Sequence, residues 1–218
     1  MQASSINFNF KGRYFKLGEI NAQTKAVWFV LHGYGQLAQY FLPKFKSLTE
    51  HGICVIAPEG LSHYYLEDAS TRSKTGSTRV GASWMTRENR LTDIENYLTY
   101  LNSVFKQETA NQENLDITLL GFSQGAATAS RWALSHSIYF RRLILWAGIL
   151  PSDMDFEKGK RLLKQKEVAV VYGKNDPFLN ESRFAELKTL TEKLEITPRP
   201  IVFDGAHEIH EPTLLALI

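Results

Sequence analysis

The stretch Gly121-Phe122-Ser123-Gln124-Gly125 matches the pattern G-x-S-x-G and constrains the fold more than any other part of this sequence. The apolar run Ile117–Leu120 stands directly before it, and a segment with a helical pattern, residues 125–136, follows it. In that context the pattern predicts a tight, strained turn between a strand and a helix, with the serine hydroxyl exposed. Larger side chains at the two glycine positions would collide with the neighbouring strand and helix. A nucleophilic serine is therefore favoured over a chance match in a flexible turn.

Apolar runs alternate with helical patterns along the rest of the chain. The continuous run Ala26–Leu31 is typical of a strand that is buried on both faces. A long helix is predicted after Thr86, with that residue as its N-cap. Its apolar side chains are spaced three and four residues apart and share one face: Leu91, Ile94, Leu98, Leu101 and Phe105. Further strands are expected at residues 53–57, 143–146, 168–171 and 200–203, and further helices at 38–50 and 184–194. This alternation predicts an α/β fold with a mostly parallel central sheet and helices on both faces.

Two segments fall outside this alternation. Near the start, Ile6, Phe8 and Phe10 alternate with polar residues, and a turn leads from them to Tyr14–Leu17. That pattern predicts an N-terminal antiparallel β-hairpin. The stretch 59–85 has no clear pattern, and an irregular loop of that length in a compact domain is usually functional. It is too short for a separate cap domain, so no large cap domain is expected.

A general base is expected late in the chain, because the order in this strand–turn–helix context is serine, acid, histidine. His207 follows Gly205 in a loop just past the last predicted strand, where the glycine gives the backbone freedom to bring an imidazole over the sheet edge. His210 precedes the terminal helix and is more typical of a cap or surface residue. We therefore predict His207 as the base. The two histidines lack the H-E-x-x-H pattern and further ligands, so neither a metal nor a cofactor is expected.

The acid of the predicted triad has two candidates. Asp176 lies in the turn Gly173–Pro177, at the carboxyl end of the predicted strand 168–171. Catalytic groups in open α/β sheets gather at such strand ends. Asp153 follows the strand that ends at Trp146 and remains the alternative. We predict that Asp176 holds the histidine tautomer and stabilises the imidazolium.

A glycine-rich turn, Leu31-His32-Gly33-Tyr34-Gly35, closes the first central strand. Turns of this kind supply one backbone N–H to the oxyanion, and the residue after the nucleophile supplies the other. We assign these two donors to the backbone N–H groups of Tyr34 and Gln124. We expect His32 to be a buried structural residue that braces the turn.

Composition narrows the class of protein further. Of 218 residues, 44% are hydrophobic and 22% charged, as in globular domains. The formal net charge of +2 and the lack of a basic stripe argue against a nucleic-acid partner. A single cysteine, Cys54, permits no internal disulfide and fits a reducing compartment. The start has no signal-peptide pattern and no apolar run reaches the ~18 residues of a membrane span, so a cytoplasmic location is expected.

These motifs, in this order and spacing, resemble those of the α/β-hydrolase superfamily. The G-F-S-Q-G sequence in so short a chain resembles the phospholipase/carboxylesterase group, which includes acyl-protein thioesterases and small bacterial serine esterases. The resemblance extends from Val27 onward and implies that residues 1–218 form a single α/β-hydrolase domain. Ala126 stands where that group commonly has a second glycine, and the segments 62–65 and 79–85 do not match the thioesterases.

The resemblance implies a serine hydrolase that cleaves small-molecule carboxylic esters through an acyl-serine intermediate, with thioesters and lysophospholipids as further candidate substrates. Tyr64, Tyr65, Trp84 and Met85 are predicted to line an acyl or aryl pocket. The alternative is a cluster that pins this segment to the body of the protein. Two other functions stay open: an acyltransferase or peptidase that uses the same triad, and a non-catalytic binding protein on a hydrolase fold. The sequence leaves the oligomeric state open.

Overall fold

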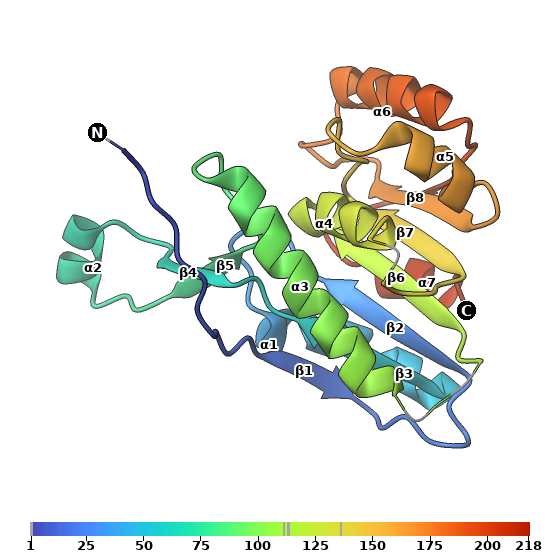
Figure 1. Ribbon diagram of the computed structural model, residues 1–218, viewed down its shortest axis with the longest axis horizontal. Coiled ribbons are helices and arrows are strands. Elements are labelled where there is room, and N and C mark those ends of the chain that lie inside the picture. The colour runs from blue at the N-terminus through green and yellow to red at the C-terminus, as the bar shows by residue number, and fades with distance from the viewer. Residues whose placement is uncertain (1, 111, 113, 136) are drawn as a thin grey trace.

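The computed structural model describes residues 2–110, 112, 114–135 and 137–218. A seven-stranded sheet with the order β1-β3-β2-β6-β7-β8-β9 forms the centre of this part of the chain (Figure 1). Its strands are β1 (Tyr14–Leu17), β2 (Ala26–Leu31), β3 (Ile53–Pro58), β6 (Ile117–Phe122), β7 (Arg142–Trp146), β8 (Glu167–Gly173) and β9 (Arg199–Phe203). All neighbouring pairs are parallel except β1 and β3, which are antiparallel. The predicted mostly parallel sheet is confirmed.

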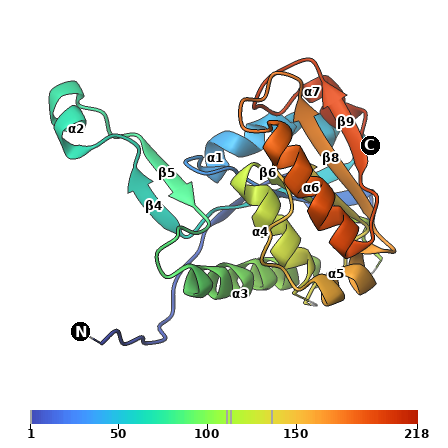
Figure 2. The same ribbon diagram turned by 90° about the horizontal axis from the view of Figure 1, so that it is seen from above.

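Helices cover both faces of this sheet (Figures 1 and 2). One face carries α3 (Arg90–Thr109), α4 (Gln124–Ala133), α5 (Phe156–Leu163) and α6 (Glu181–Leu194), and the other carries α1 (Ala38–Phe41), the 3₁₀ helix η1 (Leu42–His51) and α7 (Glu211–Leu215). Strand β2 is apolar at successive positions because it contributes side chains to the cores on both faces of the sheet. Val27, Phe29 and Leu31 join the first core, whereas Trp28 and Val30 join the second. Successive side chains of a strand point to opposite faces, and both faces of β2 are buried.

The chain order places a switch point beside β2. From β2 the chain goes to β3 on one side, and it later returns to β6 on the other side. In open α/β sheets the crevice at such a point, outside the carboxyl ends of the strands, is where ligands bind. The turn after β2 and the turn after β6 are therefore neighbours.

The N-terminal antiparallel pairing exists, but it uses a different partner from the one predicted. Residues 2–13 form no helix or strand, and Ile6 and Phe8 are exposed. Strand β1 instead pairs with β3, in a register that sets Tyr14 opposite Pro58. The alternating residues before it have no second apolar layer to cover them, so alternation alone does not hold a strand there.

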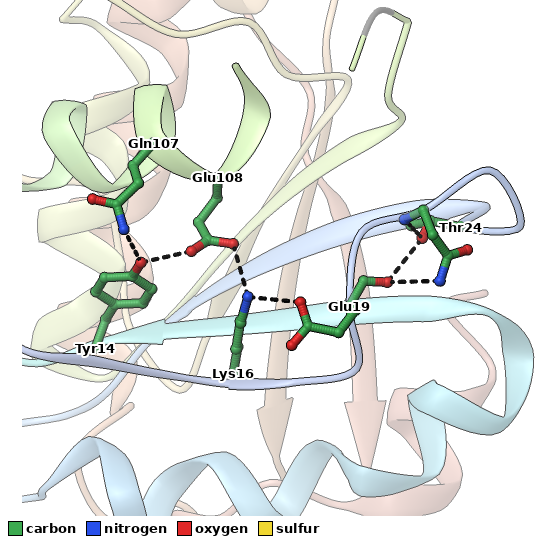
Figure 3. A network of polar contacts seen from close by, with 7 residues as sticks. Tyr14, Lys16, Glu19, Thr24, Gln107 and Glu108 are labelled. Atoms are coloured by element: carbon green, nitrogen blue, oxygen red, sulfur yellow. Dashed lines mark hydrogen bonds and ion pairs between the residues drawn. The ribbon is translucent and has the colours of Figure 1, made fainter. Parts of the chain in front are cut away.

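A polar network fixes β1 against the last turns of α3 (Figure 3). The Tyr14 hydroxyl donates to Glu108 Oε1 over 2.6 Å and accepts from Gln107 Nε2 at 2.6 Å. Lys16 Nζ lies between Glu19, at 2.9 Å, and Glu108, at 3.4 Å. Burial and the hydrogen bond to Glu108 raise the pKa of Tyr14 to about 12. The phenol therefore stays a neutral donor that anchors this edge strand.

The stretch 59–85, predicted to be an irregular loop, is regular. It contains β4 (Ser62–Tyr65), α2 (Ala69–Thr75) and β5 (Val80–Ser83), and β4 and β5 form a two-stranded antiparallel sheet. We call residues 62–83 the arm. It projects from the body with α2 at its tip (Figures 1 and 2). The Asp68 side chain caps α2 by accepting from Ser70 N and Thr71 N at 2.8 and 2.9 Å, and Gly76 ends the helix at φ 68°.

Helix α3 starts later than predicted. Its N-cap is Asn89 rather than Thr86, and Leu91 is exposed. Tyr97, Leu101, Val104 and Phe105 form its buried side. The first turn extends beyond the sheet, so an apolar residue there has nothing to pack against. In the described part of the chain, we find no helix with the length and apolar character that a membrane crossing requires.

Candidate active site

The turn between β6 and α4 holds Ser123 in a strained conformation, with φ 55° and ψ −116°. We call residues 121–125 the elbow. A Cβ on Gly121 would lie 2.1 Å from the Gly125 carbonyl oxygen, and a Cβ on Gly125 would lie 2.2 Å from that of Leu31. Neither position has room for a side chain, because the backbones of β6, α4 and β2 pass each other at close range. The Ser123 N–H donates to the Trp146 carbonyl over 2.8 Å, which ties the turn to β7.

A hydrogen bond joins the predicted acid and base. His207 Nδ1 lies 2.8 Å from Asp176 Oδ2, although 31 residues separate the two in sequence. The Asp176 side chain is fully buried, and its other oxygen accepts from Phe178 N at 2.9 Å. A carboxylate only accepts hydrogen bonds, so the hydrogen sits on Nδ1 and the Nε2 lone pair is left to accept a proton.

The imidazole of His207 lies beside the elbow. Its ring contacts those of Phe122 and Phe178, with centroid distances of 4.8 and 4.7 Å, and Phe122 is the residue directly before Ser123. No hydrogen bond between Ser123 Oγ and His207 is found among the described residues. Catalytic hydrogen bonds are often long without substrate and shorten in the Michaelis complex. The structure thus brings the three residues to one edge of the sheet with the serine and the imidazole unlinked.

The two competing residues have other partners. His210 is the N-cap of α7, stacks on Phe203 at 4.9 Å, and contacts Thr213 Oγ1 through Nδ1 at 2.8 Å. Asp153 forms ion pairs with Arg90 and, at 2.6 Å, with Arg131. The hydrogen bonds from these two arginines outweigh burial and hold the pKa of Asp153 below its usual value. In the described part of the chain, neither residue forms a hydrogen bond or an ion pair with Asp176 or His207.

The turn after β2, which we call the oxyanion turn (residues 32–36), covers the elbow. A Cβ on Gly33 would lie 3.2 Å from Ser123 Cβ. The Gly33 N–H donates to Gln36 Oε1 over 2.9 Å, which closes the turn. Within the described residues, the N–H groups of Tyr34 and Gln124 have no hydrogen-bond acceptor. Both predicted donors are thus available to a ligand oxygen.

His32 lies under the oxyanion turn and is fully buried. The Gly60 N–H donates to its Nε2 over 2.9 Å, so the ring hydrogen is on Nδ1, 2.8 Å from the Gly33 carbonyl oxygen. Burial lowers the pKa of His32 to about 4. The neutral imidazole forms a hydrogen bond through each ring nitrogen and so braces the turn. Neither nitrogen is free for catalysis.

The four predicted pocket residues have different environments. Trp84 is 2% exposed; its ring lies against His32 at 5.0 Å and its indole N–H donates to the His32 carbonyl over 2.8 Å. These contacts pin the segment to the body, which is the alternative that the sequence left open for Trp84. Met85 is half-buried, and the ring of Tyr64 packs on that of Tyr34 at 5.3 Å. Tyr65 is exposed on the arm, under the Arg72 guanidinium.

Sequence reasoning missed the side chain of Gln124, of which only the backbone was considered. Its Oε1 accepts from Trp84 N at 3.1 Å and its Nε2 donates to the Met85 carbonyl over 2.9 Å. An antiparallel bridge between Gln36 and Ala82 holds the same segment to the oxyanion turn. The end of the arm is thus fastened to both halves of the candidate oxyanion hole. No local sequence pattern predicts this attachment, because Gln124 and its partners are about 40 residues apart.

A buried carboxylate, Glu59, supports the start of the arm. Its oxygens accept from Arg13, from His63 Nε2 at 2.8 Å and from Ala38 N at 2.8 Å. Burial alone would raise the pKa of Glu59, but the hydrogen bonds outweigh it and hold the pKa below its ordinary value. An acidic residue directly after a buried apolar strand was the only sequence signal for this site.

A family model and several solved structures are similar to this chain. The family model described as serine hydrolase (FSH1) matches residues 22–213. Curated protein sequences give no match. Among solved structures, esterase PE8 has a TM-score of 0.67 at 19% identity, covering 95% of this chain and 96% of its own. Acyl-protein thioesterase 2 of Zea mays has a TM-score of 0.68 at 15% identity, with coverage of 95% and 96%. A phospholipase/carboxylesterase of Dyadobacter fermentans has a TM-score of 0.64 at 19% identity, with coverage of 96% of both chains. At these identities the structures bear on the fold alone.

Proposed function

This chain belongs to the serine hydrolase (FSH1) family, and from that premise we propose that it cleaves carboxylic esters through an acyl intermediate on Ser123. The observation that carries the proposal is the 2.8 Å hydrogen bond between His207 Nδ1 and the buried Asp176, next to the elbow. That bond fixes the imidazole with its free nitrogen as a proton acceptor.

In the first half of the reaction, Ser123 Oγ attacks the ester carbonyl carbon and its proton passes to His207 Nε2. The carbonyl oxygen becomes an oxyanion, which the N–H groups of Tyr34 and Gln124 stabilise. Each such donor contributes about 3 kcal/mol to the transition state. The C–O bond to the leaving alcohol then breaks, and His207 returns the proton to that alcohol. Asp176 stabilises the imidazolium throughout.

In the second half, water replaces the alcohol. His207 accepts a proton from the water, whose oxygen attacks the acyl carbon, and the bond to Ser123 Oγ breaks as the serine regains its proton. The product is a carboxylic acid. Thioesters and lysophospholipids fit the same steps with a different leaving group, so we include them in the substrate screen.

A fluorophosphonate probe and p-nitrophenyl butyrate test the proposal together. The wild type should bind the probe at Ser123 and hydrolyse the ester, and Ser123→Ala should lose labelling and about 10⁶-fold in kcat. Ser103→Ala, an exposed serine on α3, is the matched control and should keep both. A wild type that neither labels nor hydrolyses butyrate, decanoate, thioester or lysophospholipid substrates would overturn the proposal and favour a non-catalytic binding protein.

A further inference from the structure

A cavity of about 620 Å³ lies between the arm and the helices α1 and η1. Leu66 and Val80 line it from the arm, and Tyr40 lines it from α1. Tyr40 and Leu66 are among the large apolar side chains left exposed on this protein. The walls are therefore apolar and accessible, which suits a ligand chain more than a buried core.

One end of this cavity borders the oxyanion turn, because Gly35 and Gln36 line it. Gln36 lines the cavity, and its Oε1 lies 3.3 Å from the point that a Gly33 Cβ would occupy. Ser123 Cβ lies 3.2 Å from the same point. Gln36 thus lies between the cavity and Ser123, and the oxyanion turn connects the two.

The sheet order favours the acyl part of an ester, rather than the leaving alcohol, as the part that faces this cavity. His207 must protonate the leaving oxygen, so the alcohol lies on the side of that residue. His207 follows β9, at one edge of the sheet, whereas the arm follows β3, on the other side of β2 and β6. The chain that extends into the cavity therefore points away from the imidazole.

The charges that line the cavity are all positive. Lys44 and Arg79 contribute to its lining, and no acidic residue does. Arg79 Nε is paired with Glu67 Oε1 at 2.7 Å. Lys44 has no ion pair within the described part of the chain. It lies one turn beyond Tyr40. Leu37, the N-cap of α1, and seven residues of α1 and η1 lead from Gln36 to Lys44, a path of ~12–16 Å.

We propose that this cavity binds an acyl chain that ends in a carboxylate, so that the preferred substrates are esters of medium-chain dicarboxylic acids. The inference rests on the proposed function and names the substrate class of the same site. The apolar walls hold the methylene chain, and the Lys44 ammonium pairs with the terminal carboxylate at the far end. No carboxylate of the protein lines this path to repel it.

A matched pair of substrates isolates the terminal charge: p-nitrophenyl hydrogen sebacate and its methyl ester, which differ only at the far end of the acyl chain. We expect the wild type to favour the charged ester in kcat/KM. The preference should fall by about threefold in Lys44→Met and by about tenfold in Lys44→Glu, where repulsion replaces attraction. It should also weaken as ionic strength rises. Lys46→Glu, an exposed lysine of η1 outside the cavity lining, has the same change in net charge and should keep the preference.

Several outcomes contradict this inference without touching the proposed function. One is hydrolysis of both esters with the same preference in all four proteins. Another is an equal loss of preference in Lys46→Glu, which would mean that net charge and not this cavity is responsible. Failure of the proposed function would give a different result: the wild type would hydrolyse neither ester, and the fluorophosphonate probe would not label Ser123. Calorimetry with the monoamide of sebacic acid measures binding without turnover: its Kd should rise by about threefold in Lys44→Met and about tenfold in Lys44→Glu, and should be unchanged in Lys46→Glu.

Discussion

The carboxyl edge of the sheet and the arm are two neighbouring regions built in different ways. At the edge, close contacts between backbone segments fix the geometry: a Cβ on Gly121 or Gly125 would lie about 2 Å from a carbonyl oxygen. In the arm, a Cβ on Gly76 would meet nothing within 4 Å, and α2 depends on an exposed Asp68 cap. The proposed reacting groups thus sit in a tightly packed frame, whereas the tip of the arm has room for larger side chains.

Exchanging an aspartate for asparagine in each region gives the largest expected contrast. In Asp176→Asn the amide no longer acts as a pure acceptor for the His207 Nδ1–H, so the wrong tautomer is favoured and kcat should fall by about 10⁴-fold. In Asp68→Asn the new side chain caps α2 equally well, and kcat should stay within about twofold. Steady-state kinetics with a neutral ester would check both. Equal kcat values for the wild type and Asp176→Asn would show that Asp176 is not the acid of the triad.

Glycine-to-alanine substitutions measure how tightly each region is packed. Gly125→Ala forces a methyl group into the Leu31 carbonyl, and we expect a loss of at least ~3 kcal/mol in the free energy of unfolding, at the upper end of overpacking effects. Gly76→Ala meets only the strain of a left-handed residue, about 1–2 kcal/mol within the arm. Urea unfolding would report the first change, and hydrogen exchange in residues 69–79 the second. Similar unfolding curves for Gly125→Ala and the wild type would show that the elbow can relax.

This contrast also explains what the sequence could reveal. The elbow, the glycine-rich turn and the buried strands have local patterns because their constraints are local, and the predicted fold class is confirmed. The structure brings Asp176 and His207 together, although their roles stay predictions. The arm was missed because Ser62–Tyr65 and Val80–Ser83 are short and mixed in polarity, and their pairing spans about 20 residues. Trp84 illustrates the same limit, since an aromatic residue near a site packs or binds according to contacts that lie far along the chain.

His32 lies where the two regions meet, and its titration should be visible in stability. Burial lowers its pKa from 6.5 to about 4, so the unfolded chain takes up the proton first as the pH falls. Stability that is fully present above pH 6.5 should decline by roughly 3 kcal/mol as the pH approaches 4. In His32→Gln this part of the decline should disappear, while any contribution of Glu59 remains in both proteins. Urea titrations at several pH values would test it, and parallel curves for the two proteins would contradict a buried neutral imidazole.

The side chain of Gln124 should have the smallest effect and the most specific one, because it joins the elbow to the end of the arm. Gln124→Ala keeps the backbone N–H at the candidate oxyanion hole but removes the hydrogen bonds to Trp84 N and the Met85 carbonyl. We expect a loss of about 1–2 kcal/mol and faster hydrogen exchange at Ala82–Met85. Because Ala82 is bridged to the oxyanion turn, kcat should fall by several-fold, with little change in KM for a short neutral ester.

Gln124→Glu separates the two hydrogen bonds. The carboxylate can still accept from Trp84 N, but it cannot donate to the Met85 carbonyl, so exchange should rise at the segment that follows Met85 and less at Trp84. A change confined to unfolding free energy, with kcat intact in both variants, would mean that the arm is merely attached. A fall in kcat that tracks the loosening of residues 82–85 would mean instead that the rigid edge depends on the arm for the position of its oxyanion donors.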